Sequence, residues 1–173
     1  LCYVPSITNK QKSVIALQKQ GLKFDDFSLY RYKENVLETV SRDLAKMPPT
    51  CKDTVFFCTT CDPCATLKHA ETTIEAIRLI MARSRLQVRV LSKSVFIKDI
   101  ASALIDYKER IVYSLSTGTS LDEISKAIEE HASPVRLRVE TLHWLQNNNF
   151  RTYGMICPVI PSEISRVKQL LDQ

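Results

Sequence analysis

The sequence contains little glycine and has no long apolar run. Only three of its 173 residues are glycine, and neither a GxGxxG nor a Walker pattern occurs. These absences argue strongly against the glycine-rich phosphate loops of dinucleotide-binding and P-loop proteins. No apolar stretch approaches the roughly 20 residues that span a bilayer, and no signal peptide begins at Leu1. We therefore expect a domain that does not cross a membrane.

The charge and composition are those of an ordinary globular chain. Hydrophobic residues make up 45% and charged residues 25%, and the formal net charge is +5. The basic residues are scattered, so most of them are expected to lie on solvated helix faces; binding of nucleic acid is permitted but not required. The length predicts a single domain over residues 1–173, long enough to bury about 70% of its unfolded surface.

Six cysteines are many for a chain without signs of secretion, and they favour a cytoplasmic protein that uses metal, iron–sulfur or catalytic chemistry. Cys58, Cys61 and Cys64 have the C-x₂-C-x₂-C spacing of bacterial ferredoxin clusters, and Cys157-Pro158 supplies a distant Cys-Pro pair. Two interpretations stay open. These cysteines either ligate a cluster, or Cys58 is a buried core residue while Cys61 and Cys64 line a pocket.

Strand-like and helix-like segments alternate, which predicts an α/β fold with parallel strands joined by right-handed crossovers. A complete eight-stranded barrel needs about 250 residues, so we expect a partial (β/α) barrel. Three details are also expected: burial of Thr54–Cys58 on both faces, an inward Ile105, and a Ser120/Glu123 capping box. The expected strands are Thr54–Cys58, Gln87–Leu91, Arg110–Leu115 and Phe150–Ile156; the expected helices are 36–47, 71–83, 95–107, 120–130, 135–147 and one from Pro161, with a short helix at Val14–Gln20 and an extended Phe24–Tyr32.

Each predicted strand ends in a small group of polar or thiol residues. In parallel α/β folds the carboxyl ends of the strands form the ligand-binding edge, so we expect an active-site rim there. Lys93 follows a strand and has the charge to bind a carboxylate or phosphate. Arg138 shares a helix face with Leu142 and Leu145, so we expect it to reach a buried acid or a ligand. The strand-end groups are Cys61-Asp62-Pro63-Cys64, Ser92-Lys93-Ser94, Ser116-Thr117-Gly118-Thr119 and Cys157-Pro158.

In their order along the chain, these segments resemble the radical SAM superfamily, in particular the branch around spore photoproduct lyase. Leu1-Cys2-Tyr3-Val4-Pro5 looks like the end of the family's CxxxCxxC cluster loop, and Lys33-Glu34-Asn35 like the lead into its first helix. The resemblance covers nearly the whole chain. Further matching segments are Thr59–Cys64, Leu91–Ser94 with Lys98-Asp99, Ser114–Thr117, Glu130 to Leu142, and Pro158–Pro161.

This resemblance implies a radical SAM type partial barrel, truncated at the N-terminus so that the first two cluster cysteines precede Leu1. It implies a [4Fe–4S] cluster with Cys2 as the retained ligand, and S-adenosylmethionine cleaved to a 5′-deoxyadenosyl radical for hydrogen abstraction in a lyase-like reaction. It also implies an electron donor of flavodoxin or ferredoxin type. The residues that would contact S-adenosylmethionine are Thr60, Asp62, Lys93, Ser114, Ser116 and Arg138.

The chain departs from the family's T-D-P-Y turn, because Cys61 and Cys64 replace its threonine and tyrosine. The substrate is therefore not identified by the resemblance. Two other classes remain open: an iron–sulfur or metal-binding electron-transfer domain that uses Cys58, Cys61 and Cys64, and a catalytically silent barrel that acts as a binding module.

Overall fold

The computed structural model describes residues 34–58 and 61–172. The chain divides into two compact units, Leu1–Asn35 and Val36–Gln173, and the fold below is that of the second. A single domain over residues 1–173 stays a prediction, and the segments predicted at Val14–Gln20 and Phe24–Tyr32 lie outside the described residues. The elements are α3 (Val36–Leu44), β1 (Thr54–Phe57), α4 (Leu67–Arg83), β2 (Gln87–Ser92), α5 (Ile97–Ala103), the 3₁₀ helix η1 (Ile105–Arg110), β3 (Ile111–Thr117), α6 (Asp122–Ile128), α7 (Val135–Asn147), β4 (Arg151–Ile156) and α8 (Ile164–Leu171).

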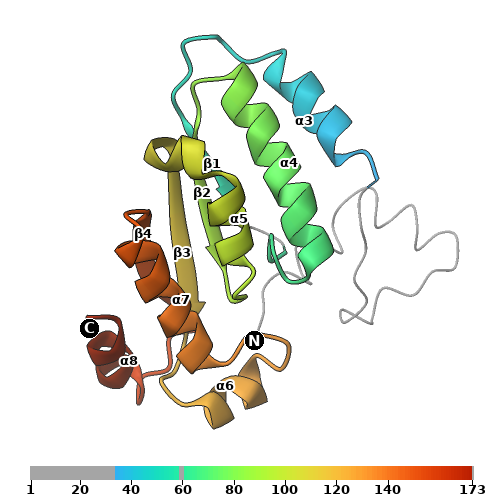
Figure 1. Cartoon of the computed structure of the whole chain (residues 1–173). Helices are drawn as coiled ribbons and strands as arrows, with labels where there is room; N and C mark the ends of the chain where they lie inside the picture. Colours follow the sequence, from blue (N-terminus) through green and yellow to red (C-terminus); the bar gives the residue numbers. More distant parts are fainter. Residues whose placement is uncertain (1–33, 59–60, 173) are drawn as a thin grey trace, which may run out of the picture. The chain divides into compact units, whose positions relative to one another are not determined.

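The described strands form an open, four-stranded parallel sheet in the order β1-β2-β3-β4. Each strand therefore pairs with the next one along the chain, and α4, α5 and α7 lie on the same side of the sheet (Figure 1). Doubly wound sheets instead reverse their strand order and carry helices on both faces. The predicted mixed α/β fold with parallel strands is confirmed, and the sheet is not closed.

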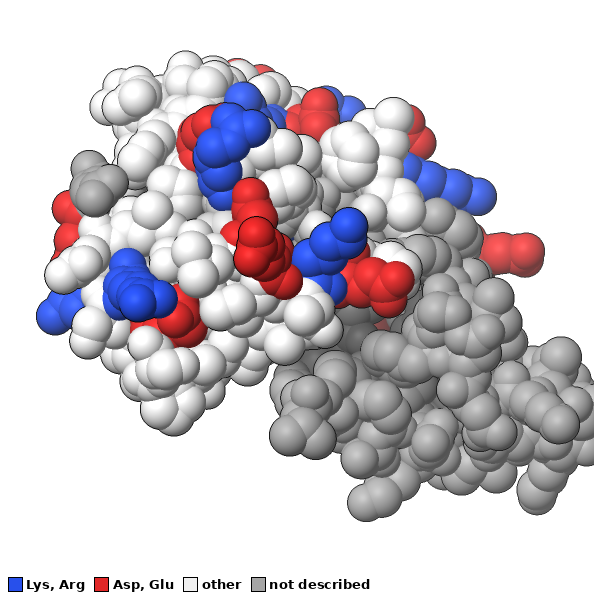
Figure 2. Space-filling view, turned by 90° about the horizontal axis from the view of Figure 1, so that it is seen from below, with Lys and Arg blue, Asp and Glu red and all other residues white. Residues whose placement is uncertain are grey.

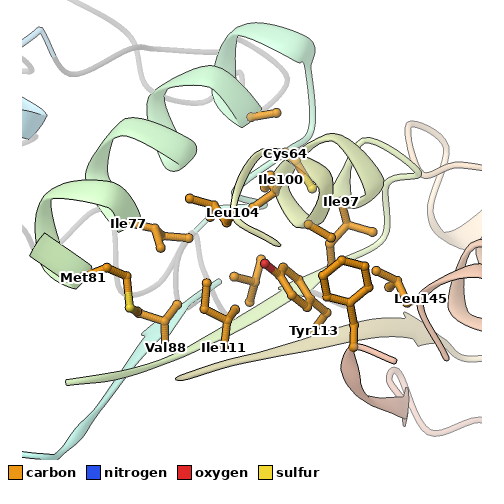
Figure 3. Close-up of a cluster of buried hydrophobic side chains, with 14 of the residues drawn as sticks. Cys64, Ile77, Met81, Val88, Ile97, Ile100, Leu104, Ile111, Tyr113 and Leu145 are labelled. Carbon is orange, nitrogen blue, oxygen red and sulfur yellow. The ribbon is translucent and has the colours of Figure 1, made fainter. Parts of the chain in front are cut away.

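The core lies between the sheet and this layer of helices. Val88, Val90, Ile111 and Tyr113 alternate on one face of β2 and β3 and are fully buried. Figure 3 shows Ile77 of α4 and the α5 residues Ile97 and Ile100 against this face, with the Tyr113 ring among them. Burial of each large aliphatic side chain contributes about 1.5–3 kcal/mol, so this cluster holds the layer of helices on the sheet.

Two predictions about burial are wrong. Phe56 of β1 is 38% exposed, because no helix among the described residues covers that face of the sheet. Ile105 is 54% exposed, because α5 ends at Ala103 and η1 turns Ile105 away from the face that buries Leu104.

The predicted capping box at Ser120 is also wrong. α6 begins at Asp122, and its N-cap residue Leu121 makes no side-chain capping bond. The Leu121 amide donates to Thr119 Oγ1 (3.1 Å), and Asp122 Oδ1 accepts from the amide of Val135 at the start of α7 (2.5 Å). The acid of this turn therefore caps the next helix.

Candidate functional site

Asp62 fastens the loop after β1 to the loop after β2. Its carboxylate accepts from the Cys64 amide (2.9 Å), from Ser92 Oγ (2.7 and 2.9 Å to its two oxygens) and from the Lys93 amide (2.8 Å). Ser92 Oγ in turn accepts from the Ser94 amide (2.8 Å). The carboxylate thus joins two strand ends that are far apart in the sequence, as the predicted rim requires.

The thiols beside Asp62 are held in their protonated form. Cys64 is fully buried, and its Sγ donates to Ser92 Oγ (3.0 Å). Burial raises the pKa of Cys64 well above its ordinary value, and the Asp62 carboxylate adds to this effect. Burial first, then Asp62 and the neighbouring Cys61, raise the pKa of Cys58 to about 12.

The cysteines of the C-x₂-C-x₂-C segment differ in their surroundings. Cys61 is exposed, Cys64 lies in the core, and Cys58 has a positive φ of 138° at the end of β1. Within residues 34–58 and 61–172, no three His, Cys, Asp or Glu side chains are placed to hold a metal ion. The structure thus places Cys64 in the core and leaves Cys58 only half-buried, which reverses the places expected for these two residues. A cluster on this segment stays a prediction.

Glu129 forms a buried carboxylate bridge between two cations. Its Oε1 lies 2.5 Å from Lys93 Nζ and its Oε2 lies 2.9 Å from Arg138 Nη1. The Arg138 side chain is 1% exposed and that of Glu129 is 6% exposed, whereas that of Lys93 is 33% exposed. Of this triad, Lys93 is the member that can also reach a ligand.

Arg138 of α7 also binds the end of β3. Its Nη1 donates to the Ser116 carbonyl (2.7 Å), and its Nη2 donates to Ser125 Oγ of α6. Ser116 Oγ donates to the Cys157 carbonyl after β4 (3.0 Å). These contacts link the strand ends of β3 and β4 to the triad, and they confirm the expectation that Arg138 reaches a buried acid.

Ser114 has a fully buried hydroxyl without a hydrogen-bond partner. It lies between Tyr113 and Leu115 and pairs with Leu91 and Tyr153 in the neighbouring strands, so it belongs to the sheet face opposite the one on which α4, α5 and α7 pack. Its hydroxyl is closed off from solvent in this structure.

The structure therefore brings together Asp62, Lys93, Ser116 and Arg138 by hydrogen bonds, while Ser114 stands apart from this network. Thr60 and Cys2 lie outside the described residues. Glu129 was missed by the sequence analysis. The signal that could have found it is Arg138 itself, because a buried guanidinium requires a carboxylate partner.

The charge of the molecule is mixed at the end where β3 terminates. Seen from below, Lys and Arg side chains are interleaved with Asp and Glu side chains on the described surface (Figure 2). This view shows no broad basic surface of the kind that binds a nucleic-acid backbone. Nucleic acid as a partner stays a prediction.

Comparisons with family models, curated proteins and solved structures give no significant match to this chain. In the part of the chain that the structure describes, no helix is both long and apolar enough to cross a bilayer. The described part of the chain is therefore a mixed α/β protein with an open, four-stranded parallel sheet and a polar network at the carboxyl ends of its strands.

Proposed function

We propose that this chain is the core of a radical SAM enzyme. The observation that carries the proposal is the network that joins Asp62, Lys93 and Arg138 at the carboxyl ends of a singly wound parallel sheet. Partial barrels of this winding bind ligands at that edge. The resemblance of the sequence to the spore photoproduct lyase branch supplies the chemistry.

The donor groups present are compatible with S-adenosylmethionine. An ammonium group has three N–H donors, and Glu129 occupies one of those of Lys93. A ligand carboxylate would be held by the others, while Ser114, whose hydroxyl is fully buried, belongs to the proposed cofactor-binding set by the resemblance alone. Asp62 and Arg138 make their contacts with protein groups, so they position the loops. Ser116 and Thr60 complete the proposed cofactor-binding set.

When bound, the [4Fe–4S] cluster and S-adenosylmethionine would supply a 5′-deoxyadenosyl radical for hydrogen abstraction from a substrate. Cys2 would be one cluster ligand. The described residues would orient the cofactor and exclude water, and a flavodoxin-type or ferredoxin-type protein would supply the electron.

The test of the chemistry uses the native protein. After anaerobic reconstitution with iron and sulfide, a low-potential reductant and S-adenosylmethionine should yield 5′-deoxyadenosine, measured by liquid chromatography and mass spectrometry. Cys2→Ala should abolish this product. Cys61→Ser/Cys64→Ser should retain the bound iron; loss of iron in that variant would instead support the electron-transfer alternative.

The test of binding separates the enzyme from a silent binding module. Titration calorimetry with S-adenosylmethionine should show saturable binding that weakens about tenfold or more in Lys93→Met, because a charge-assisted hydrogen bond is lost. Lys126→Met is the matched control, since Lys126 is an exposed lysine of α6. No binding by the wild-type protein would remove the enzyme proposal.

A further inference from the structure

Arg89 occupies an unusual place on the sheet face opposite the one on which α4, α5 and α7 pack. Its guanidinium carbon lies 4.1 Å from the ring centroid of Tyr153 and 5.2 Å from that of Phe56. The three residues come from β2, β4 and β1, so the arginine reaches across the face between two aromatic rings. Such stacking fixes the orientation of the guanidinium before any ligand arrives.

The polar atoms around Arg89 lack partners. Arg89 Nε and Tyr153 Oη are both buried without a hydrogen bond. None of the ion pairs in the described part of the chain includes Arg89. A cation and a hydroxyl in this condition cost free energy unless an acceptor satisfies them, and native structures rarely leave several such groups together.

An open hollow of about 760 Å³ lies beside these groups, within the range of small-molecule sites. Two cationic side chains, Arg89 and Arg151, and one acidic side chain, Glu109, line the hollow. Arg151 Nη1 donates a hydrogen bond to the backbone carbonyl of Glu109 (2.9 Å). Thr54, Gln87 and Arg151 are the first residues of their strands, so the hollow lies toward the amino ends. It is therefore distinct from the network at the carboxyl ends.

We propose that this hollow binds the phosphate group of a small molecule, with Arg89 as its principal ligand and Arg151 at its rim. The fork of a guanidinium matches two phosphate oxygens, and Tyr153 Oη offers a further donor. Phe56 is 38% exposed and presents a ring on which an attached aromatic group can pack. The phosphate is either free or carried by an aromatic compound. The proposal stands independently of the radical SAM assignment.

The experiment compares inorganic phosphate, adenosine monophosphate and adenosine by titration calorimetry on the full chain at low salt. We expect adenosine monophosphate to bind, adenosine to bind at least tenfold more weakly, and the affinity to fall with added salt. Equal affinities for inorganic phosphate and adenosine monophosphate would support the site and assign it to the free ion. Absence of binding by both phosphates would overturn the proposal.

Variants locate the binding. Arg89→Met keeps a flexible side chain between the rings and should lower affinity at least tenfold, while Arg151→Gln should lower it severalfold. Arg136→Met removes one exposed arginine of α7 and should have no effect. If Arg89→Met does not fold by circular dichroism, Arg89→Lys keeps the charge but lacks the fork and should still weaken binding. Affinity lost in Lys93→Met but retained in Arg89→Met would place the ligand at the carboxyl-end network and refute the proposal.

Discussion

Tyr113 shows how one buried polar atom influences a well-packed core. Its ring is fully buried and meets Phe150 edge to face with centroids 5.6 Å apart. Its hydroxyl has no hydrogen-bond partner, and burial raises its pKa above the usual range of tyrosine. The ring therefore stabilises the fold while the hydroxyl opposes it.

Tyr113→Phe should increase the free energy of unfolding by about 1 kcal/mol, because it removes an unsatisfied buried hydroxyl and keeps the ring. Tyr113→Leu is the matched control and should decrease it by roughly 2 kcal/mol or more through loss of packing. Urea unfolding followed by circular dichroism measures both. A destabilised Tyr113→Phe variant would mean that the hydroxyl has a partner in solution, such as a bound water.

At the scale of the elements, one carboxylate joins the end of α6 to α7. Glu129 neutralises the buried Arg138 and the partly exposed Lys93. Loss of one member leaves the others without their partner in a poorly solvated place.

Glu129→Met should reduce the free energy of unfolding by roughly 3–5 kcal/mol, because it leaves Arg138 buried without a carboxylate. The double variant Glu129→Met/Arg138→Met should lose less free energy of unfolding than the two single variants lose together, and a double-mutant cycle measures the difference. Glu140→Met on α7 is the control, since its exposed pair with Arg136 should contribute less than about 1 kcal/mol. Additive losses would show that Glu129 and Arg138 do not interact in solution.

Two glycines allow elements to approach closely, but against different neighbours. A Cβ at Gly118 would lie 2.5 Å from the Pro158 carbonyl oxygen, whereas one at Gly154 would meet the Leu171 Cδ atoms of α8 at 2.8 Å. Gly118→Ala should lower the free energy of unfolding by about 1–3 kcal/mol, because the backbone at Pro158 must move. Gly154→Ala should lower it by less, because the end of the Leu171 side chain can turn away. Thermal unfolding of the two variants shows which one loses more stability. A larger loss in Gly154→Ala than in Gly118→Ala would contradict the packing described.

The elements show where sequence patterns suffice and where they fail. The periodicity of α4 and the strand at Gln87–Ser92 were predictable, because local hydrophobic spacing determines them. The exposure of Phe56 was not, because an apolar run does not reveal whether a second layer covers it. Ser120 failed for a related reason: its pattern fits a cap, but the Leu121 amide donates to Thr119 Oγ1 and α6 begins at Asp122 without a side-chain cap.

The site divides in the same way. Strand ends are visible in the sequence, so Asp62 and Lys93 could be placed at one edge before the structure. The partner of Arg138 could not, since Glu129 reaches it only through the packing of α6 against α7. The isolation of Ser114 from that network could not be predicted either, since Ser116 on the same face of β3 takes part in it and Ser114 does not.

For the whole molecule, the raised thiol pKa values link stability to alkaline pH. Above the ordinary thiol pKa of 9.0 the unfolded chain releases protons that folded Cys58 retains up to about pH 12. The unfolded state then binds fewer protons, so stability is complete below pH 9 and declines as the pH rises through this window.

Urea unfolding at pH 7.5, 9 and 10.5 should therefore show a free energy of unfolding that falls with pH less steeply in Cys58→Ala than in the wild-type chain. The two slopes should differ by at most about 1.4 kcal/mol per pH unit. Identical slopes in the two proteins would mean that Cys58 titrates normally in the folded state.

The sequential strand order also bears on how the chain folds during synthesis. Each strand pairs with the one made just before it, and the connecting helices are complete by the time the new strand emerges. Contacts between neighbours in the chain lower the entropy of loop closure that parallel pairing demands. The sheet can thus grow one strand at a time behind the ribosome, and of the described strands only β1 and the newest one have an unpaired edge at each stage.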